Sequence, residues 1–233
     1  MLRLLPPNPQ RIRRQVTLSI RLTAAGGVFV SLALSGCDSG SKCEAARTCE
    51  PRAESAPSAV QARRLTQDGP FIVHASRGAR AGDVLLANTH TRFYITGTPG
   101  ADGYVSFAGW VIDADVTRQR GQIDYDGLDA YAPLVNVSPI AAQSVTIEQD
   151  GSDGEEARVR VEGRCEAIPY VLGLQGATPD PVPVDVTLTY ALGADDRALR
   201  IETRIANNSD AVQAVEVGDV LQLSDDEAEP YSV

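Results

Sequence analysis

Two stretches in the C-terminal half of the chain alternate apolar and polar residues with a period of two. The first runs from Val184 to Ala191 and the second from Leu199 to Ala206, and both are rich in β-branched residues. Such alternation places apolar side chains on one face of a strand and polar side chains on the other. Residues 193–197, which read Gly-Ala-Asp-Asp-Arg, have the length and chemistry of a hairpin loop. The pattern predicts two antiparallel strands, each with one buried face.

Similar signals extend the prediction along the chain. A turn at residues 207–210 leads into a third alternating run, which predicts a three-stranded meander. The segment at residues 104–112 is apolar on both faces, as expected of a central strand. No long helical periodicity follows residue 60, and turn clusters recur about every ten residues, which favours an all-β antiparallel sandwich. The further predicted strands are residues 92–96, 104–112, 144–148, 157–161 and 212–217, with a hairpin turn at 150–154.

The N-terminal segment has the pattern of an export signal. Residues 1–36 contain five arginines and no acidic residue, and an apolar run extends from Leu22 to Leu34. This run is too short to span a bilayer, which requires roughly 20 helical residues. A basic head, a short apolar stretch and small residues together are typical of a cleavable secretory signal. A buried N-terminal helix is the alternative, but the run offers no polar face for one.

The apolar run ends in Leu34-Ser35-Gly36-Cys37. This motif resembles the lipobox of bacterial lipoproteins, in which a branched apolar residue and two small residues precede the cysteine. The resemblance implies cleavage before Cys37 and lipidation of that thiol, so that the protein is held at the cell envelope of a bacterium by a lipid anchor. A plain secretory signal with an incidental cysteine is the alternative. Asp38 implies inner-membrane retention in enterobacterial lipoproteins, but other lineages use different signals, and the choice of membrane stays open.

Residues 37–65 are expected to form a flexible tether, because Ser, Ala, Gly, Pro and mixed charges dominate there. Cys43 and Cys49 lie within it, and an oxidising compartment favours a disulfide between them. Cys165 is then left over and is expected to be buried and inert. Metal binding by these cysteines is the alternative, although no Cys-x-x-Cys pair supports it. Residues 66–233 are the expected β-sandwich domain.

The predicted domain resembles the galactose-mutarotase-like β-supersandwich. The residues that suggest it are 82–88, 92–95, 109–114, 189–190, 199–203 and 207–209. Mutarotase-like enzymes use histidine and a carboxylate on a sugar ring, so the resemblance makes a sugar-active enzyme one alternative function. An accessory module at the front of a larger exported hydrolase is another. Only His74 and His90 could supply the histidine, and both lie at turns or strand ends without matching a catalytic motif.

Candidate ligand-binding residues cluster between residues 113 and 131. The carboxylates of Asp124 and Asp126 lie in a Gly-containing segment and could bind Ca²⁺, although the EF-hand spacing is missing. Calcium is the single cofactor left open, and no other metal site is expected. Tyr125 and Tyr131 flank polar residues and are the candidates for stacking on a sugar ring, whereas Trp110 is assigned to the core.

Charge and motif content limit the function classes. The chain has 233 residues and a formal net charge of −10, and loss of the five arginines with residues 1–36 would lower it to −15. An acidic chain has no electrostatic basis for binding nucleic acid. No nucleophile elbow, phosphate-binding glycine loop or zinc-ligand pair is present. We therefore expect a membrane-anchored lipoprotein without catalytic activity, whose domain binds or scaffolds a glycan or an envelope protein.

Overall fold

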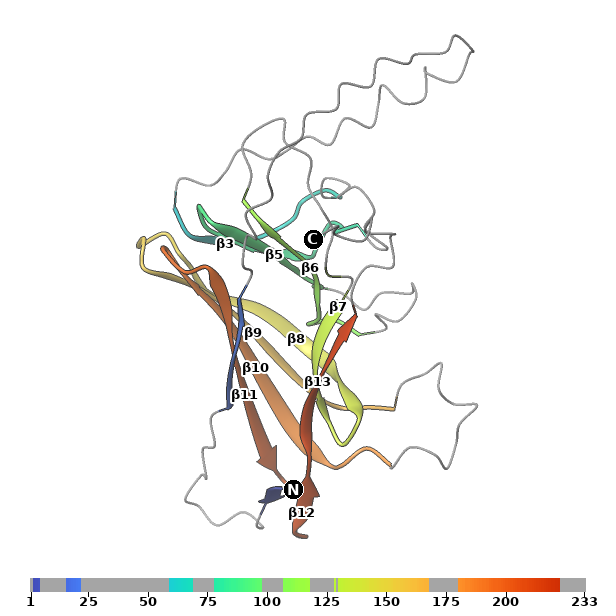
Figure 1. The fold of residues 1–233 in the computed structure, drawn as a ribbon. Coiled ribbons are helices and arrows are strands. Elements are labelled where there is room, and N and C mark those ends of the chain that lie inside the picture. Colours follow the sequence, from blue (N-terminus) through green and yellow to red (C-terminus); the bar gives the residue numbers. More distant parts are fainter. Residues whose placement is uncertain are drawn as a thin grey trace, which may run out of the picture.

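The computed structural model of the chain shows an all-β protein with antiparallel strands (Figure 1). The expected fold class is thereby confirmed. The described residues are 2–4, 16–21, 59–68, 78–97, 107–117, 128, 130–167 and 180–222.

Most strands belong to one continuous sheet, whose order is β2-β11-β10-β9-β8-β7-β6-β5-β4-β3, and β13 pairs with β7 outside that path. A separate short pair joins β1 and β12. The strands are β1 (Leu2–Leu4), β2 (Val16–Arg21), β3 (Gln61–Arg64), β4 (Val84–Ala87), β5 (Thr91–Ile95), β6 (Val111–Val116), β7 (Ala130–Val135), β8 (Ser138–Asp150), β9 (Glu156–Cys165), β10 (Val184–Gly193), β11 (Ala198–Asn207), β12 (Gln213–Val215) and β13 (Val217–Gln222).

The long strand β8 connects the two halves of this sheet. Its first residues form a tight hairpin with β7, in which Val135 pairs with Ser138, and its remainder pairs with β9 as far as Asp150. The sheet then doubles back, because β3 contacts both β8 and β9. Figure 1 shows the resulting arrangement, in which β3, β5 and β6 lie across one end of β8 to β11. This is a sandwich-like fold built from one folded sheet.

Four hydrogen bonds, made by three side chains, tie the two halves together. The Asn88 amide, after β4, donates to the carbonyl oxygens of Gly193 at 2.8 Å and Asp196 at 2.7 Å in the β10–β11 hairpin. The Tyr190 hydroxyl in β10 donates to the Gly109 carbonyl at 2.7 Å. The guanidinium of Arg64 in β3 donates to the Val145 carbonyl in β8.

The half formed by β8 to β11 follows the predicted alternation. In β10, Val184, Val186, Leu188 and Tyr190 are buried and the residues between them are partly exposed. β10 pairs with β11 from Val184 opposite Asn207 onward, as the first hairpin requires. The second predicted hairpin is also present, and Gly151 and Gly154 in its turn have φ angles of 81°. Positive φ at these positions is the reason that glycine is used there.

The half formed by β4 to β6 is buried on both faces. Phe93 and Ile95 of β5 belong to the main hydrophobic core, while Tyr94 between them belongs to a second cluster on the opposite face. Trp110 lies in that second cluster with 6% of its surface exposed, which confirms its expected place in the core. β6 is a central strand, but it overlaps the strand predicted at residues 104–112 only at Val111 and Ile112. Residues 107–110 form a turn before it, and residues 104–106 lie outside the described residues.

The meander predicted after β11 is wrong in its third strand. β12 pairs with β1, and β13 crosses to β7, where Val217 faces Val135. Asn136 directs this crossing, because its N–H donates to the Glu216 carbonyl at 2.9 Å and its side-chain oxygen accepts from the Glu216 N–H at 2.7 Å. Partners of equal alternation cannot be told apart by sequence pattern, and this local contact decides between them.

Three strands lie in segments for which the sequence predicts other roles. β1 and β2 fall within residues 1–36, the predicted export signal. β3 falls within the last residues of the predicted tether. Val60 and Ala62 are buried in the core there, but Gln61 between them and the consecutive Arg63 and Arg64 after them conceal the alternation.

The described cysteine matches its expected environment. Cys165 is a free thiol with 7% of its surface exposed, and burial raises its pKa to about 11. A thiol with a raised pKa is a poor nucleophile at neutral pH. Cys43 and Cys49 lie outside the described residues, so their pairing stays a prediction, and the described part of the chain contains no disulfide.

Candidate functional site

Tyr131 is placed in the core rather than on an open binding face. Only 3% of its surface is exposed, and its hydroxyl donates to the Asp219 carboxylate of β13 at 2.7 Å. Burial, together with this carboxylate, raises the pKa of Tyr131 far above its ordinary value. The ring therefore fastens β13 to β7 and is not available for stacking on a ligand.

Most other candidates lie outside the described residues. This applies to Cys37, His74, Asp124, Tyr125 and Asp126, whose predicted roles stay predictions. 

His90 is described and lies half-buried in the turn between β4 and β5. Its backbone N–H donates to the Asn88 side-chain oxygen at 2.8 Å. This contact shows a turn position for His90. Within the described ranges, no group of three or more histidine, cysteine or acidic side chains could hold a metal ion.

The acidic residues of β6 serve the sheet. Asp113 and Asp115 are 2% and 5% exposed, and Asp115 forms an ion pair of 3.3 Å with Arg92 of the neighbouring β5. Asp115 also accepts a hydrogen bond from the Val116 N–H at 2.7 Å. A buried charge requires such partners, and removing one partner is costly. These residues are therefore committed to internal contacts.

A polar hollow of about 230 Å³ lies on the outer face of β8 to β11. Its floor is β10, which contributes only the short side chains of Thr187, Thr189 and Ala191. Longer side chains rise on either side from β9 and β11, because each floor residue pairs with one residue of both strands. The hollow thus arises from a row of small residues between two rows of large ones. Its walls consist of Glu148, Arg158, Arg160, Arg200, Glu202 and Arg204.

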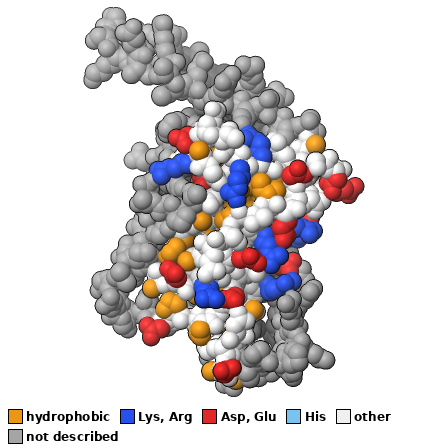
Figure 2. All heavy atoms as spheres, turned by 180° about the vertical axis from the view of Figure 1, so that it is seen from behind, with side chains coloured by type: hydrophobic (Ala, Val, Ile, Leu, Met, Phe, Trp, Pro, Cys, Tyr) orange, Lys and Arg blue, Asp and Glu red, His pale blue; other side chains and the backbone are white. Residues whose placement is uncertain are grey.

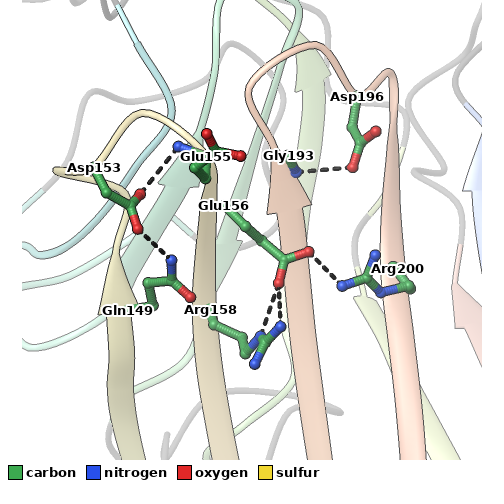
Figure 3. A network of polar contacts seen from close by, with 8 residues as sticks. All are labelled: Gln149, Asp153, Glu155, Glu156, Arg158, Gly193, Asp196 and Arg200. Atoms are coloured by element: carbon green, nitrogen blue, oxygen red, sulfur yellow. Dashed lines mark hydrogen bonds and ion pairs between the residues drawn. The ribbon is translucent and has the colours of Figure 1, made fainter.

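Glu156 spans one end of this hollow (Figure 3). Its carboxylate accepts a 2.8 Å hydrogen bond from Arg158 Nε on the same strand, and its second oxygen accepts from Arg200 on β11. Burial raises the pKa of Glu156, but the hydrogen bonds from the two arginines outweigh it, so this pKa lies below its ordinary value. The contact links β9 to β11 across β10.

The remaining wall residues differ in how they are paired. Arg160 lies between two carboxylates, at 3.1 Å from Glu148 and 2.6 Å from Glu162. Arg204, at the other end of the hollow from Glu156, is half-buried, and its side chain forms no hydrogen bond or ion pair with any described residue. Figure 2 shows that basic and acidic side chains are interspersed on the surface that it presents.

The hollow is suited to binding a polar ligand. Four arginines and two glutamates line it, and the adjacent carboxylates of Glu156 and Glu162 pair with three of these arginines, so the charges of the hollow and its rim balance. Guanidinium groups bind carboxylates and other oxygen-rich groups through paired hydrogen bonds, and carboxylates accept from hydroxyls. The sequence pattern alone does not indicate this site. The alternation predicts that each lining residue is exposed to solvent. Only the pairing of β10 with β9 and β11 shows that its small residues lie between the charged side chains of those two strands.

No protein-family model matches this chain, and no curated protein or solved structure shows significant similarity to it. None of the residues that the structure describes belongs to a helix long and apolar enough to cross a membrane.

Proposed function

We propose that the chain is an exported lipoprotein, anchored to a bacterial membrane through Cys37, and that its sheet domain binds an envelope component without catalysis. The motif Leu34-Ser35-Gly36-Cys37, directly after an apolar run and a basic head, carries the proposal. A multiply acylated cysteine gives stable anchoring, because each buried CH₂ contributes about 0.8 kcal/mol. On this proposal β1 and β2 leave the protein with residues 1–36.

The test of the anchor is Cys37→Ser in cells that produce the full-length chain. We expect loss of labelling by palmitate and retention of the leader, seen as an increase in mass. Cys43→Ser is the matched control, because it removes a thiol only a few residues away and should leave labelling unchanged. An unmodified Cys37 in the purified wild-type protein, found by mass spectrometry, would rule out the proposal.

The polar hollow over β10 is the proposed binding face of the anchored domain. The lining of threonines, arginines and glutamates supports a ligand rich in hydroxyl or carboxylate groups, as glycans and peptidoglycan are. Thr189→Arg places a long side chain on the floor of the hollow and should abolish retention of the protein on peptidoglycan or a glycan array. Thr146→Arg is the control, because Thr146 is exposed on β8 and does not line the hollow. Equal retention of both variants would remove the hollow from the proposal.

A further inference from the structure

The strand β11 becomes the edge of the sheet when residues 1–36 are removed, a condition that rests on the proposed function. β11 pairs with β10 on one side over most of its length, and with β2 on the other side from Ala198 to Thr203. Loss of β2 leaves a row of backbone N–H and C=O groups without strand partners. Such a row is a template for another strand.

This edge lacks the usual features that prevent strand addition. β11 runs from Ala198 to Asn207 without a proline, and its register with β10 shows no bulge. The opposite end of the sheet differs, because β3 is only four residues long and packs on β8 and β9. Short or covered edges resist pairing, whereas long regular ones invite it. The pairing of β2 shows that β11 accepts a further antiparallel strand.

We propose that two processed copies pair antiparallel through β11, with the two-fold axis at Thr203. In this register Glu202 of each copy lies opposite Arg204 of the other, and Ile201 lies opposite Ile205. Residues directly opposite in an antiparallel pair share a face, so both ion pairs form on the outer surface. Arg204, which has no partner among the described residues, thereby gains a carboxylate.

Two neighbouring registers are less favourable. An axis at Glu202 places the two Glu202 carboxylates opposite each other and Arg200 opposite Arg204, so like charges repel. An axis at Ile201 pairs Arg200 with Glu202, but Arg200 is already bound by Glu156, and the overlap shrinks to Ala198–Arg204. The axis at Thr203 overlaps β11 from Leu199 to Asn207 and leaves no charge facing its like.

The dimer would also join the two polar hollows. Both copies present their outer faces on the same side of the extended sheet, because residues that face each other across the axis lie on one face. The wall of each hollow formed by β11 would then lie beside the same wall of the other copy. A ligand that repeats along an envelope polymer could contact both.

Disulfide crosslinking in intact membranes tests the register. Thr203→Cys, introduced with Cys43→Ser, Cys49→Ser and Cys165→Ser so that Cys37 stays available for lipid, places two thiols opposite each other within reach of a disulfide. We expect a crosslinked dimer on a non-reducing gel. Thr189→Cys in the same background lies on β10, away from the proposed contact, and should give no disulfide crosslink, so that it runs as a monomer on the same gel.

Charge reversal then tests the ion pairs in the crosslinking protein. Glu202→Arg should lower the crosslinked fraction by roughly tenfold, the change that about 1.4 kcal/mol makes in an equilibrium constant. Adding Arg204→Glu restores opposite charges across the axis and should restore the crosslink. Glu148→Arg, the same reversal on β8, is the control and should have no effect.

Three results would overturn the inference. They are the absence of a crosslink in processed, palmitate-labelled protein, a crosslink that Glu202→Arg does not weaken, and a double variant that does not recover. The absence of a crosslink in such protein would contradict the dimer but not the proposed lipid anchor. Retention of the leader in wild-type protein is a different failure, because it removes the proposed function and, with it, the free edge of β11.

Discussion

The two halves of the sheet bury their residues in different ways. In β8 to β11, buried and exposed side chains alternate, and the outer face carries the charged rows that enclose the hollow. In β4 to β6 nearly every residue is buried, because the main core covers one face and a second cluster covers the other. The second cluster includes Leu65, Ala79 and Trp110, which flank the strands. The chain thus covers one half with its own connecting segments and leaves the outer face of the other half exposed.

Alanine substitution of adjacent residues gives the largest test of this contrast. Phe93→Ala and Tyr94→Ala should each lower the free energy of unfolding by roughly 3–5 kcal/mol, because both faces of β5 are packed. On β10, Leu188→Ala should cost roughly 2–5 kcal/mol, whereas Thr189→Ala should change stability by less than about 0.5 kcal/mol. Urea denaturation measures all four. If Tyr94→Ala hardly changed the free energy of unfolding, the second face of β5 would not be tightly packed.

Glycine substitution tests the contact between the halves. Gly109 has a φ of 85°, and a Cβ there would lie 2.6 Å from Val161 Cγ1 of β9. Gly109→Ala should therefore cost roughly 1–3 kcal/mol for overpacking, in addition to roughly 1–2 kcal/mol for the left-handed backbone. 

Gly154→Ala is the control for Gly109→Ala, because Gly154 has a φ of 81° but no atom within 4 Å of the added Cβ. It should show the backbone cost alone. Thermal unfolding measures both variants. Equal decreases in melting temperature would mean that β9 moves away from the added Cβ at residue 109 without a loss of stability.

Alkaline pH should destabilise the core through groups of both halves. Burial raises the pKa of Cys165 from 9.0 to about 11, so the stability it contributes is complete below about pH 9 and is lost as pH rises through 11. Burial also raises the pKa values of Tyr131 and Tyr190, so their contribution falls above about pH 10. 

Stability measured against pH separates these groups. Cys165→Ala should flatten the decline between about pH 9 and 11 and leave the decline due to the tyrosines. An unchanged profile for Cys165→Ala would mean that its thiol ionises as freely in the folded protein as in the unfolded one.

A small loss of stability is expected when a contact on the open half is removed. Glu156→Gln weakens the contacts to Arg158 and Arg200, which are partly exposed. Exposed pairs contribute roughly 0.2–1 kcal/mol, so urea denaturation should show a loss within that range. The pKa of Glu156 is lowered in the folded protein. The difference in free energy of unfolding between wild type and Glu156→Gln should therefore shrink as pH falls through that pKa. A loss equal to that of Leu188→Ala would show that the outer face is as tightly coupled as the core.

Sequence patterns predicted the open half far better than the covered one. The alternation from Val184 to Tyr190 identifies strand, face and hairpin because water lies on one side. β7 and β13 were not predicted, since a strand covered on both faces has no alternation and β13 exposes residues such as Leu221. The polar hollow was missed because it depends on which strands are neighbours, and residue spacing within one strand carries no such information. Tyr131 was misplaced for the same reason, since its partner Asp219 is distant in sequence.

The sharing of β8 by both halves has a mechanical consequence. Its backbone pairs with β7 at one end and with β9 along the rest, so neither half can be pulled away while the other keeps all its strand partners. Amide hydrogen exchange in β8 is therefore expected to require opening of the whole fold, whereas the β10–β11 turn can exchange through local fraying. Under the proposed function, a force between the lipid anchor and a bound ligand would therefore act on both halves of the sheet through β8.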